Sequence, residues 1–135
     1  MAARGKQNGS YQGMNWIRPA TRLAIYLRDG LACAYCGEGV EDGAKMTLDH
    51  LKPYSEKPDH SPHNLVTCCL RCNSSRGDRP VATFAHAVAE YLNRGIRADD
   101  IIKHVRNCAR RKLPREEARK LLRRRGTVAQ ALNTL

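Results

Sequence analysis

The sequence predicts an α+β fold in which a small hairpin-and-helix core is flanked by α-helices and followed by a mostly helical C-terminal extension. Three observations predict it. Two Cys-x2-Cys pairs, Cys33/Cys36 and Cys69/Cys72, enclose two short strand-like segments. The segments outside this stretch carry apolar residues at helical spacing. The chain has 135 residues and only 5% aromatic residues, so a small aliphatic core that needs a cross-link is expected.

The hairpin and the helices are expected where the residue patterns are strongest. Gly and Pro residues mark the helix ends, and the strands are joined by a loop of 13 residues, a length usually found where a loop is functional. Helix 80–93 is expected to bury Phe84, Val88 and Tyr91. The expected elements are helix 18–27, strand 45–50, strand 64–67, short helix 73–77, helix 80–93 with Gly95 as its stop, a helix that opens at Asp99-Asp100 and is interrupted at Pro114, helix 115–125, and a last short helix within 128–135.

The charge of the chain lies on its two flanks. The net charge is +11, divided into +5 over 1–28, −3 over 29–102 and +9 over 103–125. Basic flanks suit a polyanion, and nucleic acid is the usual one, although a basic helix face can also serve only to keep a protein in solution. We divide the chain into a disordered basic arm (1–16), a core (17–95) and a basic helical C-terminal extension (96–135).

The six cysteines favour a metal over disulfides. The N-terminus lacks the apolar segment of a secretory signal and no stretch is long and apolar enough to cross a membrane, so we expect a cytoplasmic protein, where disulfides are rare. Cys33, Cys36, Cys69 and Cys72 form two knuckles that predict a closed, structural four-thiolate Zn²⁺ site. Buried free thiols are the alternative. Cys68 offers a competing register, but the x2 spacing favours Cys69.

Chemically active residue types lie between and beside these pairs. Asp49 is a hard oxygen ligand for ions such as Mg²⁺, and His50 titrates near neutral pH and can take a proton from water. Asn73 adds an amide oxygen directly after a zinc knuckle, and Asn64 can lock the long loop by hydrogen bonds to its backbone. His60 and His63, in the loop itself, are expected to be solvent-exposed, with a contact to DNA or metal as the alternative.

Over about residues 17–80 the sequence resembles the HNH endonuclease family, with its ββα-metal fold. The resemblance is specific because order, spacing and residue type agree across several elements. The matching residues are Arg28-Asp29-Gly30, Cys33-Ala34-Tyr35-Cys36-Gly37, Thr47-Leu48-Asp49-His50, Pro53, Asn64-Leu65-Val66, Cys69-Leu70-Arg71-Cys72-Asn73 and Arg76-Gly77.

The resemblance implies a role for each matching polar residue. Asp49 and Asn73 would hold one divalent cation, His50 would be the general base, and Asn64 would orient the loop. Asn73 stands where many relatives have His, which makes the site oxygen-rich and favours Mg²⁺ or Mn²⁺. Arg76 stands where relatives often carry Lys and is expected to face a phosphate. Because neighbours on a regular strand point to opposite faces, the strand is expected to end or twist at Asp49 and His50.

The leading hypothesis is therefore an HNH endonuclease that hydrolyses DNA phosphodiester bonds. With one active site per chain, a monomer is expected to nick DNA. The main competitor is a non-catalytic, zinc-dependent nucleic-acid-binding module, and a third reading is an assembly factor whose basic helices bind protein. Monomer and homodimer both remain open, as does a phage or mobile-element origin. Basic residues of the C-terminal helices are expected to contact DNA phosphates, foremost Arg110, Arg111, Arg115 and Arg119.

Overall fold

The computed structural model describes residues 15–52 and 59–135. Most of the expected arm, 1–16, and the loop residue Pro53 therefore lie outside the described residues. The elements in chain order are α3 (Pro19–Arg28), η1 (Val40–Asp42), β1 (Met46–His50), η2 (Pro62–Asn64), β2 (Leu65–Cys69), α4 (Leu70–Arg76), α5 (Val81–Leu92), α6 (Ala98–Arg110), α7 (Arg115–Arg125) and α8 (Val128–Asn133).

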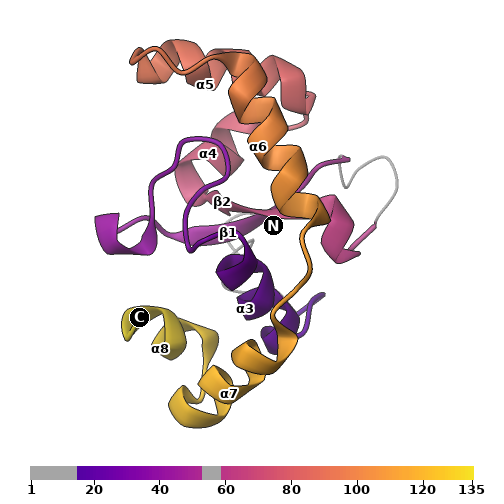
Figure 1. Ribbon diagram of the computed structural model, residues 1–135, viewed down its shortest axis with the longest axis vertical. Helices are drawn as coiled ribbons and strands as arrows, with labels where there is room; N and C mark the ends of the chain where they lie inside the picture. The colour runs from indigo at the N-terminus through magenta and orange to yellow at the C-terminus, as the bar shows by residue number, and fades with distance from the viewer. Residues whose placement is uncertain (1–14, 53–58) are drawn as a thin grey trace, which may run out of the picture.

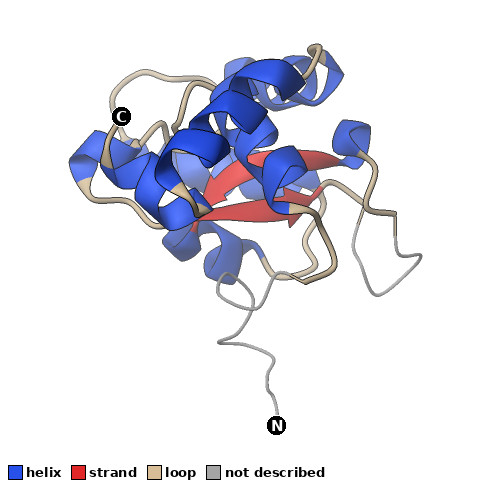
Figure 2. Ribbon diagram, turned by 90° about the horizontal axis from the view of Figure 1, so that it is seen from below, coloured by secondary structure: helices blue, strands red, loops and turns tan. Residues whose placement is uncertain are grey.

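A two-stranded antiparallel hairpin lies at the centre of the molecule. Strand β1 pairs with β2 in a register that runs from Met46 opposite Cys69 to His50 opposite Leu65. Helix α4 follows β2 without a loop and packs against both strands. The α+β class is thus confirmed, and Figure 2 shows the two strands side by side with helices around them.

Helices cover the hairpin from two ends (Figure 1). Helices α5 and α6 pack on each other at one end, and α7 and α8 lie at the other end beside α3. Ala118 of α7 and Ala131 of α8 are fully buried, as are Leu23 and Ile25 of α3. The basic extension is therefore packed against the core and shares its hydrophobic interior. Among the described helices, none is long and apolar enough to span a bilayer.

Several boundaries differ from the sequence prediction for identifiable reasons. Helix α4 begins at Leu70 because the Cys69 side chain accepts a hydrogen bond from the Cys72 amide and caps the first turn. Helix α5 ends before Asn93, which adopts the left-handed conformation (φ 49°) in place of the expected stop at Gly95. Tyr91, expected on the packed face, is 66% exposed.

Candidate metal centre and catalytic site

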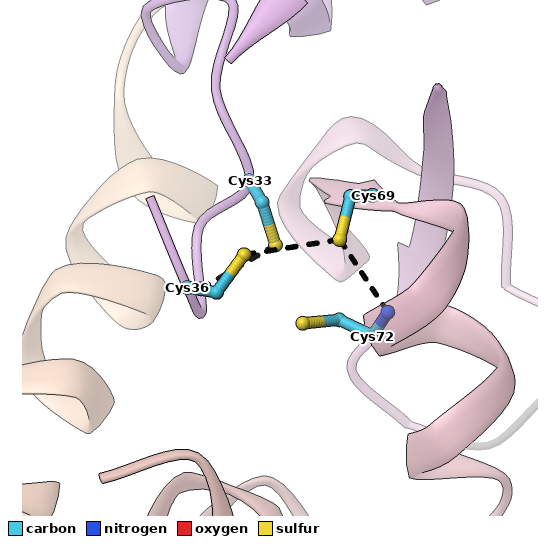
Figure 3. A group of neighbouring side chains, drawn as sticks. All are labelled: Cys33, Cys36, Cys69 and Cys72. Carbon is cyan, nitrogen blue, oxygen red and sulfur yellow. Dashed lines mark hydrogen bonds between the residues drawn. The ribbon is translucent and has the colours of Figure 1, made fainter. Parts of the chain in front are cut away.

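Four cysteine side chains meet at the start of the hairpin and its end (Figure 3). The sulfur atoms of Cys33, Cys36, Cys69 and Cys72 all lie within 4.8 Å of one another, and all four residues are buried. The Cys36 and Cys69 sulfurs are 3.8 Å apart. Thiolates bound tetrahedrally to zinc at 2.3 Å stand about 3.8 Å from each other, so the cluster fits a closed four-thiolate Zn²⁺ site.

Backbone amides shape both knuckles. The Cys36 amide lies 3.5 Å from the Cys33 sulfur, and the Cys72 amide lies 3.4 Å from the Cys69 sulfur. Gly37, with φ 84°, allows the tight turn after the first knuckle. Cys68 is buried but is not a member of the cluster, so the register Cys69-x2-Cys72 expected from the spacing is the one that the structure brings together.

Asp49 is buried on the face of β1 that α4 covers. Its Oδ2 accepts a hydrogen bond of 2.9 Å from the Tyr35 hydroxyl and forms an ion pair with Arg76. Burial raises the pKa of the Asp49 carboxyl, while the Arg76 guanidinium and the Tyr35 hydroxyl act in the opposite direction. The other oxygen, Oδ1, accepts no hydrogen bond from any described residue, which leaves a buried carboxylate oxygen suited to a hard cation.

Arg76 has a different place from the one expected. It is 2% exposed, and its nitrogens donate to the backbone carbonyls of His50 (2.8 Å), Leu51 (2.9 Å) and Arg79 (2.8 Å) besides the Asp49 carboxylate. A guanidinium used in this way does not face a phosphate. It instead holds the carbonyls of His50 and Leu51 where β1 ends, while Asp49 and His50 are both still paired with β2.

Asn73 reaches from α4 to the same face of β1. Its Nδ2 donates to the Thr47 hydroxyl (2.7 Å) and to the Leu48 carbonyl (3.1 Å). The Thr47 hydroxyl already donates to the Cys68 carbonyl, so both partners of Nδ2 act as acceptors and the orientation of the amide is defined. Thr47 and Asp49 share a face of the strand. The Asn73 amide oxygen and the Asp49 carboxylate therefore belong to one side of the hairpin.

His50 is the last residue of β1 and lies beside two aromatic rings. Its Nε2 lies 3.0 Å from Nδ1 of His60, and its ring centroid lies 5.0 Å from that of Trp16. Burial, and secondly the neighbouring His60, lower the pKa of His50 to about 4 from its ordinary 6.5. His50 is therefore neutral around pH 7 in this environment, as a general base must be.

Asn64 connects the two ends of the long loop. Its Oδ1 accepts a hydrogen bond of 3.0 Å from the Lys52 amide, and its Nδ2 donates to the Asp59 carbonyl at 2.9 Å. This is the contact pattern expected of a residue that locks a loop. The turn that carries Asn64 is held in addition by the buried Arg28, which donates to the Pro62 and Leu65 carbonyls at 3.0 and 2.7 Å.

The basic residues expected to contact DNA are exposed on the C-terminal helices. The end of α6, with Arg110 and Arg111, lies next to η2 because His63 Nδ1 donates to the Ala109 carbonyl at 3.0 Å. Arg115 and Arg119 are exposed on α7, where Arg119 forms a weak surface pair with Glu116 at 3.5 Å. The positive charge thus begins beside the loop that carries Asn64.

Three contributors to the site were missed or misjudged in the sequence. Tyr35 lies between the cysteines of the first knuckle, a position that gives no hint of a bond to Asp49. Trp16 precedes the first helix, and nothing in the sequence pattern links it to His50. His60, expected to be solvent-exposed, is half-buried between Trp16 and His50, with ring centroids 4.6 Å and 5.2 Å away.

Part of the chain is similar to known endonucleases. Residues 33–79 match the family model described as HNH endonuclease. The CRISPR-associated endonuclease Cas9 of Corynebacterium diphtheriae is 36% identical over 59 residues, which make up 43% of this chain and 5% of that protein.

A solved structure is also similar in part. The crystal structure of the Type II-C Cas9 enzyme from Actinomyces naeslundii is 25% identical, with a TM-score of 0.39, over 68% of this chain and 13% of that chain. The chain thus spans only a small fraction of the length of both relatives.

Proposed function

We propose that this chain hydrolyses DNA phosphodiester bonds with His50 as the general base and one divalent cation at Asp49 and Asn73. The observation that carries the proposal is that Asp49 and Asn73 lie on one face of β1 and that His50 is the next residue and the last of the strand, within residues 33–79, which match the HNH endonuclease model. Basic residues at the end of α6 and on α7 are the proposed DNA contacts, namely Arg110, Arg111, Arg115 and Arg119.

The donor set supports a hard cation at this position. Asp49 offers the carboxylate oxygen Oδ1, and Asn73 offers its amide oxygen because its nitrogen is committed to Thr47 and Leu48. Oxygen donors favour Mg²⁺ or Mn²⁺ over softer ions. When bound, such a cation supplies positive charge that stabilises the developing charge on the phosphate and on the leaving oxygen.

The protein residues then account for the remaining chemistry. His50, neutral at pH 7, takes a proton from the attacking water. The water oxygen forms a bond to phosphorus, the bond from phosphorus to the 3′ oxygen breaks, and that oxygen takes a proton from solvent. The products are a 5′-phosphate and a 3′-hydroxyl. Arg76 and Tyr35 hold Oδ2 of Asp49, which fixes the direction of Oδ1. Asn64 keeps the loop beside His50 in place.

The four-cysteine cluster is proposed to hold Zn²⁺ for a structural purpose only. All four sulfurs are used, so no coordination position is open to substrate. One catalytic histidine per chain makes one cut, so a monomer is expected to nick and a double-strand break would need two chains or two events.

The test is the conversion of supercoiled plasmid to open circles by the zinc-loaded chain in Mg²⁺ or Mn²⁺. Wild type and His86→Ala should nick, because His86 is exposed on α5 away from the site. Asn73→Ala should need a higher cation concentration for the same rate, and His50→Ala should be inactive. A zinc-loaded wild type that binds plasmid but never cuts it would instead identify a nucleic-acid-binding module.

A further inference from the structure

The first cysteine knuckle carries a side chain that reaches the proposed cation site. Tyr35 lies between Cys33 and Cys36, and its hydroxyl donates a hydrogen bond of 2.9 Å to Oδ2 of Asp49. The tyrosine is 3% exposed and the aspartate 5%, so the contact is shielded from water. A single side chain of the four-cysteine centre therefore ends on a proposed ligand of the divalent cation.

The knuckle that carries Tyr35 is bonded to the hairpin beside Asp49. The Ala34 amide donates to the Thr67 carbonyl of β2 at 2.9 Å. Thr67 is the partner of Leu48 in the strand register, and Leu48 directly precedes Asp49 in β1. Backbone pairing therefore places the knuckle relative to Asp49, and the binding of its two thiolates to one ion would close its turn in that position.

Packing holds the Tyr35 ring in one orientation. The ring meets Phe84 of α5 edge-on, with ring centroids 5.0 Å apart and an interplanar angle of 70°. A buried ring in this arrangement cannot move its hydroxyl away from Asp49 unless the neighbouring core also moves. The hydroxyl is therefore presented to the carboxylate at a fixed place.

Two donors from different elements meet at one oxygen of Asp49. The Tyr35 hydroxyl comes from the knuckle, and the Arg76 guanidinium comes from α4. One donor alone would let the carboxylate turn about the bond that joins it to its side chain, whereas two donors at Oδ2 restrict that rotation. Loss of a group that orients a metal ligand typically lowers metal affinity or activity by about 10- to 100-fold.

We infer that Tyr35 is a positioning residue through which the first zinc knuckle sets the affinity of the divalent-cation site at Asp49. The inference rests on the proposed function, since it takes Asp49 as a ligand of the cation. It gives the four-cysteine centre a consequence besides stability. The zinc ion has no contact with DNA, but the knuckle that it closes determines how strongly Mg²⁺ or Mn²⁺ is held.

Tyr35→Phe is the variant that tests the inference, because it removes one oxygen atom and keeps the ring against Phe84. Tyr26→Phe is the matched control. The Tyr26 side chain is also buried, and its hydroxyl donates to the carbonyl of Met46, the first residue of β1, at 3.2 Å. Each variant loses one buried hydroxyl and its hydrogen bond, so a difference between them in cation binding does not come from lower stability.

The first measurement is Mn²⁺ binding to the zinc-loaded full chain without DNA, followed by the electron paramagnetic resonance signal of free Mn²⁺. Tyr35→Phe should have a Kd about 10- to 100-fold above that of wild type, whereas the Kd of Tyr26→Phe should be unchanged. Asp49→Asn should bind much more weakly, because it lacks the charge that attracts the cation. Equal Kd values for Tyr35→Phe and Tyr26→Phe overturn the inference. Wild-type affinity in Asp49→Asn refutes the proposed cation site and the role of Tyr35 with it.

The second measurement is the Mg²⁺ dependence of plasmid nicking. Tyr35→Phe should need about 10- to 100-fold more Mg²⁺ for half of its maximal rate, with a rate at saturating Mg²⁺ within about threefold of wild type, because its hydroxyl acts only on Asp49. A lower maximal rate at an unchanged Mg²⁺ requirement contradicts a role in cation affinity. A wild type that never nicks, but whose affinity for Mn²⁺ falls in Tyr35→Phe, refutes the hydrolytic function and leaves the role of Tyr35 standing.

Discussion

Replacement of Arg76 tests whether this buried guanidinium holds the site together. Arg76→Ala leaves the Asp49 carboxylate buried without its cation and removes donors from the carbonyls of His50, Leu51 and Arg79. Removal of one partner from a buried ion pair typically costs about 3–5 kcal/mol. Domain stability is typically about 5–15 kcal/mol, so the variant should be close to unfolding at room temperature.

The side-chain chemistry of the guanidinium allows a finer comparison. Arg76→Lys keeps the positive charge but cannot reach Asp49 and the three carbonyls at once, because an ammonium group has one nitrogen and a guanidinium has three. Each lost hydrogen bond to a charged group is worth about 1.5–3 kcal/mol, so the lysine variant should fall between wild type and Arg76→Ala.

The assay is urea unfolding of the zinc-loaded chain, followed by circular dichroism. The matched control is Arg79→Ala, since the Arg79 side chain, in the described part of the chain, donates to the Ser75 and Arg76 carbonyls and lies over the Phe84 ring, away from Asp49. That control should lose about 1 kcal/mol or less, the net value of a typical hydrogen bond. A loss below about 1 kcal/mol for Arg76→Ala would refute the reasoning that Arg76 neutralises Asp49 and anchors the strand end.

Three further outcomes follow from the metal centre, His50 and the basic helices. Chelation of zinc, or Cys36→Ser, should abolish cooperative unfolding, because structural zinc contributes about 10–16 kcal/mol of binding energy to folding. A Cys36→Ser protein that folds without zinc would contradict the proposal of a structural zinc site. Because burial lowers the pKa of His50 from its ordinary value of 6.5 to about 4, His50 stays neutral down to a pH well under 6.5, and the acid limb of kcat/KM should lie there. A midpoint at or above pH 6.5, in protein that still holds its zinc, would contradict this. Double replacement of Arg110 and Arg111 by Ala should reduce the slope of log affinity for DNA against log salt concentration by about 2. The control Arg94→Ala, before the start of α6, should leave this slope unchanged. Equal slopes for wild type and the double variant would exclude Arg110 and Arg111 as phosphate contacts.

The hairpin, the four-cysteine cluster and the helices could be predicted because local patterns encode them. Cysteine spacing identified all four members of the cluster, and Pro114 and Gly126 marked the bounds of α7 as they are observed. Such features depend on residues close in sequence or on a repeated pattern, so they can be found without knowledge of the tertiary structure.

The contacts within the site could not be predicted in the same way. Arg76 lies 27 positions from Asp49, and its burial depends on where α4 crosses β1. The sequence offered only a cation near the site, and an exposed phosphate contact was the simpler expectation. Trp16 and His60 contact His50 because of the path that the chain takes around the end of the strand. No pattern in the sequence predicts that path. Tyr91 shows the reverse: its apolar spacing was helical, but in the described part of the chain it contacts Arg71 at the surface and is left largely exposed.

The most direct test of the central claim is single-turnover nicking of supercoiled plasmid by zinc-loaded protein in saturating Mg²⁺, with wild type and His50→Ala compared at pH 7. General-base catalysis contributes about 10²- to 10⁴-fold, so His50→Ala should cut at least about 100-fold more slowly while binding DNA and zinc as wild type does. The nicks should be sealed by DNA ligase without end repair, because they carry a 5′-phosphate and a 3′-hydroxyl. Equal cutting rates for the two proteins would contradict the assignment of His50, and intact plasmid with wild type would contradict the nuclease function.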